Sequence, residues 1–183
     1  RSTPPAARSG GLAAATIRTV SGSLVRPTIR SNATVSIAAC TEAGVLVVNQ
    51  SGANAEAVAE HVVAMLLSLS KNIPQTDRSL RTQRGVDREV FKGRNAQGRT
   101  IGIIGLGEVG RRVARICGKG LEMRVLAYDP YIEAAHFRER GAVDVTLDEL
   151  LAQSDFITIH CPYNTETKGL IGRRELALMR PEA

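Results

Sequence analysis

The stretch TIGIIGLGEVGRRVARICGKGLEMRVLAYD, Thr100 to Asp129, predicts a strand, a tight glycine turn, a helix and a second strand in succession. Its first strand is a short apolar run around Ile103 with no charged residue, as expected of a parallel strand covered on both faces. The second strand, Met123 to Tyr128, ends at Asp129. This order of elements favours an α/β fold, a Rossmann-type doubly wound parallel sheet.

The glycine turn, GLGEVG, has the spacing of a dinucleotide-binding turn. In such a turn Gly105 would let the chain reverse, Gly107 would let the backbone approach a pyrophosphate, and Gly110 would let the helix pack closely on its strand. The helix that follows would aim free N–H groups and the positive end of its dipole at the phosphates. The alternative is an ordinary glycine turn with no ligand.

The acid at the end of the second strand decides between these alternatives and between cofactors. Asp129 stands 19 residues after Gly110, where a carboxylate can accept hydrogen bonds from the adenosine ribose hydroxyls. A free ribose gains charge-assisted bonds of about 1.5–3 kcal/mol there, whereas a 2′-phosphate would meet like charge. Strand, turn, helix and acid occur together, so we expect the cofactor to be NAD and not NADP.

Composition excludes several other classes of function. The chain has 183 residues, and 43% of them are hydrophobic, yet no apolar run is long enough to span a membrane, so we expect no membrane partner. The net charge of +6 could suggest nucleic acid. However, residues 1–41 contain five arginines and no acid, which leaves the remainder nearly neutral, and no aromatic–basic patch accompanies the glycine turn. We therefore expect no nucleic-acid partner.

The cysteines and histidines give no sign of a metal site. They are scattered through the chain without metal-ligand spacing: Cys40, Cys117, Cys161, His61, His136 and His160. An odd number of dispersed cysteines in an α/β chain is typical of reduced thiols. We therefore expect a cytoplasmic protein with no metal.

The rest of the chain is predicted from its periodicity and its glycines. The expected elements are a helix over 37–43 closed by Gly44, a buried strand over 45–49, a helix over 56–71, an exposed helix and loop over 75–99, helices over 133–140, 147–152 and 172–181, and a strand over 156–160. The helix over 56–71 is apolar around most of its circumference. We therefore expect it to be buried on more than one side, against its own sheet and a partner subunit in a homodimer.

The first 35 residues are rich in Ser, Thr, Arg, Ala and Gly and lack clear periodicity. They could be a transit-type leader, but the first methionine is Met65, which favours a chain that begins inside something larger. We expect residues 1–52 to be a remnant of a second α/β domain, the substrate domain, with an irregular N-terminal segment. Residues 53–183 are then an incomplete NAD-binding domain.

Several motifs in order carry a resemblance to a known family. NQSGANAEAVAEH, GRTIGIIGLGEVGRRVA, LAYDPY and DFITIHCPYNTETKGLIGRRELALMRP resemble the D-isomer-specific 2-hydroxyacid dehydrogenases, which include phosphoglycerate dehydrogenase and hydroxypyruvate or glyoxylate reductase. The resemblance covers about residues 35–183. It implies hydride transfer between NAD and a small 2-hydroxy or 2-keto acid.

The resemblance also implies roles for particular residues. The three glycines, together with the N–H groups of Glu108 and Val109, would hold the pyrophosphate, and Asp129 would hold the ribose. Cys161 and Pro162 match a turn that lines the adenine and nicotinamide side of the cofactor. Asn54 matches a position near the reacting centre; its alternative is a residue of the turn at a helix N-terminus.

The chain also departs from the family pattern. Arg30 and Ser31 stand in a loop, 28–34, where the family has small residues that bind the substrate carboxylate. The family's catalytic arginine, carboxylate and histidine lie beyond Pro181. His160 is an alternative acid–base group, but its place in the pattern is structural, and Glu108 should point away from the phosphates. We therefore expect no catalytic residue in this chain and no turnover by the chain alone.

Two alternatives to a dehydrogenase remain. The family also resembles transcriptional corepressors, in which the nucleotide fold acts as a binding module. The irregular first 35 residues suggest a catalytically dead, degenerate gene product as the other alternative.

Overall fold

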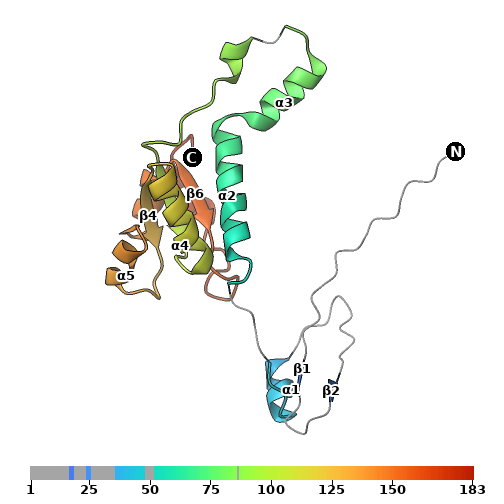
Figure 1. Cartoon of the computed structure of the whole chain (residues 1–183). Helices are drawn as coiled ribbons and strands as arrows, with labels where there is room; N and C mark the ends of the chain where they lie inside the picture. The colour runs from blue at the N-terminus through green and yellow to red at the C-terminus, as the bar shows by residue number, and fades with distance from the viewer. Residues whose placement is uncertain (1–16, 19–23, 26–35, 48–51, 86) are drawn as a thin grey trace, which may run out of the picture. The chain divides into compact units, whose positions relative to one another are not determined.

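The parallel sheet that the glycine-rich stretch predicts is present in a computed structural model of the chain (Figure 1). The structure describes residues 17–18, 24–25, 36–47, 52–85 and 87–183. The chain divides into two compact units, Arg1–Ser51 and Gly52–Ala183. The assignment of the first unit to a substrate domain stays a prediction, and the loop over 28–34 lies outside the described residues.

Four parallel strands form the sheet of the second unit, in the order β5-β4-β3-β6. They are β3 (Thr100–Ile104), β4 (Arg124–Tyr128), β5 (Val143–Asp144) and β6 (Phe156–Ile159). The chain steps outward from β3 to β4 and β5, then returns across the sheet to place β6 on the other side of β3. The strand order therefore reverses at β3, and open α/β sheets bind ligands at the carboxyl edge of such a point.

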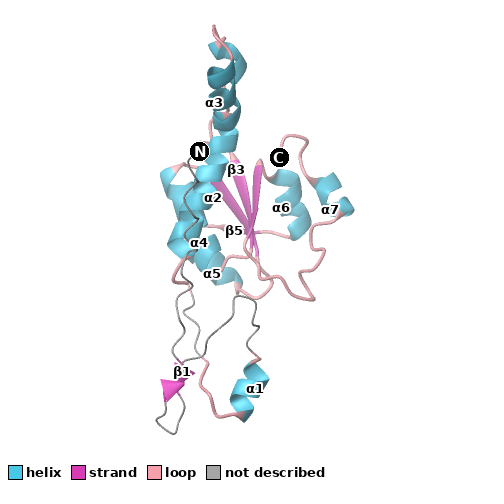
Figure 2. Cartoon of the chain, turned by 90° about the vertical axis from the view of Figure 1, so that its right-hand side faces the viewer, coloured by secondary structure: helices cyan, strands magenta, loops and turns pink. Residues whose placement is uncertain are grey.

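Helices cover both faces of this sheet. Figure 2 shows α2 (Ala55–Ser70), α4 (Glu108–Arg115) and α5 (Ala134–Glu139) on one face, and α6 (Leu147–Gln153) and α7 (Arg173–Leu178) on the other. The remaining helical segments of this unit are α3 (Ile73–Thr82), a 3₁₀ turn η1 (Arg88–Phe91) and a π-helical turn η2 (Ile116–Gly120) that extends α4. Most predicted elements are therefore confirmed within one or two residues.

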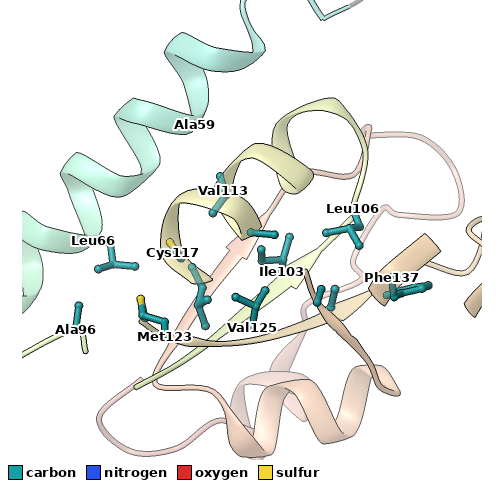
Figure 3. Packing of buried hydrophobic residues seen from close by; sticks show 14 residues of the cluster. Ala59, Leu66, Ala96, Ile103, Leu106, Val113, Cys117, Met123, Val125 and Phe137 are labelled. Carbon is teal, nitrogen blue, oxygen red and sulfur yellow. The ribbon is translucent and has the colours of Figure 1, made fainter. Parts of the chain in front are cut away.

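Two apolar clusters hold the layers together. The larger one joins α2, α4 and α5 to the sheet, with Leu66, Ile103, Val113 and Phe137 almost fully buried (Figure 3). The smaller one packs Leu150 and its neighbours on α6 against the opposite face. Because β3 contributes to both clusters, its five residues are all buried, which confirms the expectation of a strand covered on both faces.

The described residues of the first unit form a two-stranded antiparallel pair, β1 (Ile17–Arg18) with β2 (Leu24–Val25), and a helix, α1 (Ile37–Glu42). Gly44 follows the helix with φ of +63°, so this predicted helix end is confirmed. The predicted buried strand over 45–49 is wrong in its described part. Leu46 is 70% exposed, because no other described segment covers this apolar run.

Within the described chain α2 is buried on one side only, and its burial against a partner subunit stays a prediction. Its buried residues are Ala55, Ala59, Leu66 and Ser70, which all lie toward α4 and the sheet. Met65 and Leu69 on the remaining surface are 48% and 71% exposed. Helix α3 has no buried residue, which confirms an exposed helix within 75–99.

Candidate functional site

Two of the three glycines in the turn are needed by the fold itself. Gly105 has φ of +90°, and a Cβ built on it would lie 2.7 Å from the backbone nitrogen of Cys161. A Cβ on Gly110 would lie 2.2 Å from the carbonyl oxygen of Gly105. The chain can therefore reverse after β3, and α4 can begin against that strand, only because both positions lack a side chain. The predicted structural roles of these two glycines are confirmed.

Gly107 differs, because no protein atom lies within 4 Å of a Cβ built on it. Packing within the protein therefore does not require the absence of a side chain here. Among the described residues, the N–H groups of Gly107, Glu108 and Val109 have no hydrogen-bond acceptor. Free donors beside an open space at the start of α4 fit a bound pyrophosphate.

Asp129 lies at the end of β4, beside this turn. One of its carboxylate oxygens, Oδ2, accepts from the N–H of Leu106 at 2.9 Å, and Oδ1 accepts from the N–H of Tyr131 at 3.1 Å. These two bonds fix the orientation of the carboxylate. Since an ionised carboxylate has about four acceptor positions, each oxygen can still accept from a ribose hydroxyl.

Two arginines of α4 form ion pairs with the side chain of Glu108. Its Oε2 lies 2.6 Å from Nη2 of Arg111 and 2.7 Å from Nη1 of Arg112. Hydrogen bonds and charge from these partners lower the pKa of the Glu108 carboxyl to about 2, so it is ionised at neutral pH. Its charge is thus compensated by the two arginines of the helix.

Cys161 and Pro162 follow β6, the strand next to β3. They line a cavity of about 310 Å³ with Ile159, Tyr163 and Leu170, and its lining is mostly apolar. This volume is at the lower end of the range for ligand sites. The sheet therefore brings the glycine turn, Asp129 and this cavity to one carboxyl edge.

His160 and Asn54 do not form an acid–base site in the described chain. The ring Nε2 of His160 lies 2.9 Å from Oγ1 of Thr158, and partial burial lowers the pKa of the imidazole, which is therefore neutral at pH 7. No carboxylate contacts this ring among the described residues. Asn54 stands at the N-cap position of α2, but its side chain makes no capping bond.

Two long-range contacts at this edge could not be read from the sequence. Arg140 donates from Nη1 to the carbonyl oxygen of Leu106 at 2.5 Å, across 34 residues. The hydroxyl of Tyr131 donates to the carboxylate of Glu166, which joins the loop after β4 to the loop after β6. Arginine after a helix and tyrosine after an Asp-Pro pair are common surface features, so neither signal identifies its partner.

Comparison with known proteins identifies the same domain. Residues 63–183 match the family described as "D-isomer specific 2-hydroxyacid dehydrogenase, NAD binding domain". D-3-phosphoglycerate dehydrogenase of Archaeoglobus fulgidus is 44% identical over 146 residues, which are 80% of this chain and 27% of that protein. The chain therefore spans about a quarter of the length of this relative.

Solved structures agree. D-lactate dehydrogenase from Escherichia coli matches 80% of this chain and 45% of its own chain, with a TM-score of 0.68 and 36% identity. D-lactate dehydrogenase from Aquifex aeolicus, complexed with NAD and lactic acid, matches 80% of this chain and 43% of its own, with a TM-score of 0.69 and 33% identity. The chain belongs to the D-isomer-specific 2-hydroxyacid dehydrogenases, and its glycine turn lies in the NAD-binding domain of that family.

Proposed function

We propose that this chain is the cofactor-binding part of a dehydrogenase that interconverts 2-hydroxy acids and 2-keto acids, of the phosphoglycerate dehydrogenase or hydroxypyruvate/glyoxylate reductase type. One observation carries the proposal: Gly107 borders open space beside three N–H groups that have no acceptor among the described residues. A glycine that internal packing does not require, placed beside free donors, is best explained by a ligand that approaches the backbone.

Different residues at the carboxyl edge of the sheet would bind different parts of the cofactor. The N–H groups of Glu108 and Val109 would donate to the pyrophosphate, and Asp129 would accept from the ribose hydroxyls. Cys161 and Pro162 would line the pocket on the adenine and nicotinamide side. When bound, NAD supplies the hydride acceptor, and these side chains supply binding and orientation.

The dehydrogenase is favoured over a corepressor-like binding module by the relatives, which are phosphoglycerate and lactate dehydrogenases. We also propose that the 183 residues alone do not turn over substrate. The described histidine nearest the edge, His160, is neutral and bonded to Thr158, and it has no carboxylate to orient it. A degenerate gene product would differ by failing to bind the cofactor at all.

A homodimer through α2 and α3 is the second part of the proposal. Each helix exposes apolar side chains: Met65 and Leu69 lie on α2, and Ile73 and Leu80 on α3 line a shallow groove of about 280 Å³. Soluble monomers rarely expose large apolar patches. A second copy would cover these side chains with the same residues, as a two-fold interface requires.

The cellular compartment is proposed from the thiols. All three cysteines, Cys40, Cys117 and Cys161, are free, which fits a reducing compartment such as the cytoplasm. In the described part of the chain, no helix is long and apolar enough to cross a membrane.

The direct test of the proposal is a fluorescence titration of the purified chain with NADH. We expect saturable binding with one NADH per chain, displaced by NAD. A chain that folds, as judged by circular dichroism, but leaves NADH fluorescence unchanged would contradict the assignment of the glycine turn.

A further inference from the structure

A basic groove lies between α4 and α5, two neighbouring helices on the same face of the sheet (Figure 1). It has a volume of about 340 Å³. Its charged lining consists of six cations and one acid: Arg111, Arg112, Arg115, Lys119, Arg138, Arg140 and Glu139. The groove contains none of the residues assigned to the cofactor, so a ligand here would occupy a second site.

Ion pairs neutralise only part of this charge. Glu108 pairs with Arg111 and Arg112, and Glu56 of α2 pairs with Arg112 and Arg115. With Glu139, three carboxylates therefore face six cations.

The remaining cations of the groove have no carboxylate partner in the part of the chain that the structure describes. Among the described residues, Lys119 and Arg138 form no ion pair, and both are exposed. Arg140 is held by the carbonyl of Leu106, so its guanidinium stays at the end of the groove with its charge uncompensated. Cations gathered in one concave surface reinforce one another's field and attract a compact anion of matching charge.

We propose that this groove binds an oligophosphate chain, either as free oligophosphate or as part of a nucleotide. Three uncompensated cations match an anion of three or more charges. Guanidinium groups bind phosphate oxygens through paired hydrogen bonds, and the groove presents five of them with one lysine. Its volume accommodates a triphosphate and is too small for a folded partner segment.

The test is calorimetric titration of the full chain with sodium tripolyphosphate, alone and with saturating NADH. The two ligands have separate sites, so we expect binding of one tripolyphosphate in both conditions with similar affinity. The double variant Lys119→Gln/Arg138→Gln should weaken tripolyphosphate binding about tenfold and leave NADH affinity unchanged. The double variant Arg78→Gln/Arg84→Gln is the matched control, since it removes the same charge from exposed positions on and after α3.

Each result decides for or against the groove. Equal weakening in both double variants would mean a general charge effect and would overturn the proposal. Tripolyphosphate that NADH displaces would be bound at the glycine turn, and this result would overturn it too, as would no binding at millimolar concentration. A third arm with ATP in the presence of NADH separates the two sources: tighter binding than tripolyphosphate indicates a nucleotide, and equal or weaker binding indicates the phosphate chain alone.

Discussion

Replacing Gly107 by alanine should weaken cofactor binding without harming the fold. The added Cβ meets no protein atom within 4 Å. Alanine is a poorer helix N-cap than glycine, but it also restricts the unfolded chain, and these effects of under about 1 kcal/mol oppose each other. We therefore expect the melting temperature to change by less than about 3 °C.

The ligand should meet the new methyl group directly. Forcing a methyl group into a packed contact costs about 1–3 kcal/mol, so the Kd for NADH should rise roughly 5- to 150-fold. Fluorescence titration at pH 7 gives this number, and thermal unfolding gives the stability.

Gly110→Ala is the matched control, because the same methyl group there would lie 2.2 Å from a backbone oxygen of the turn. It should lower the melting temperature by about 4 °C or more, because the added methyl group overpacks the protein itself and costs about 1–3 kcal/mol of folding free energy. The reasoning is refuted if Gly107→Ala binds NADH as tightly as the unchanged chain. It is equally refuted if Gly107→Ala destabilises the fold as much as Gly110→Ala does.

Four further results are expected. NADH should bind more tightly than NADPH, and Asp129→Ala should narrow the gap; equal affinities of the unchanged chain would contradict the role of this carboxylate. The chain should sediment as a dimer at micromolar concentration and Leu69→Glu as a monomer, because that side chain is 71% exposed; a monomeric unchanged chain would exclude the proposed interface. The carboxyl of Glu108 should titrate near pH 2 when followed by NMR, so its attraction to Arg111 and Arg112 should persist down to that pH and be lost below it. Replacing either arginine should move the midpoint of this titration toward pH 4.5. The rate of NADH oxidation with glyoxylate, hydroxypyruvate or phosphohydroxypyruvate should stay at background. Turnover that His160→Ala abolishes would show that this histidine protonates the substrate. Turnover that survives His160→Ala would show that another group does so.

The sequence predicts the second unit well because its signals are local. The glycine turn, the apolar run of β3 and the acid at the end of β4 each specify their own short segment, and their spacing specifies the sheet. The sequence does not predict the two-residue strand β5, because Val143 and Asp144 are exposed and no apolar pattern distinguishes them from a loop.

Where burial depends on another segment, the sequence misleads. The run that begins at Val45 has the composition of a buried strand, yet Leu46 is exposed. The prediction failed because composition does not show whether another segment covers the run. Within the described chain the apolar circumference of α2 is covered only toward α4 and the sheet, and its cover by a partner subunit stays a prediction. The basic groove depends on contacts across tens of residues, which no spacing rule predicts.

Leu106, in the middle of the glycine turn, is fully buried and bonded on both sides of its peptide unit. Its N–H donates to Asp129 at 2.9 Å, and its carbonyl accepts from Arg140 at 2.5 Å. These two bonds hold the turn in one conformation, so we expect no slow ordering step before NADH binds. In stopped-flow mixing, the observed rate of NADH association should therefore rise linearly with NADH concentration, without the plateau that a slow rearrangement of the turn would impose.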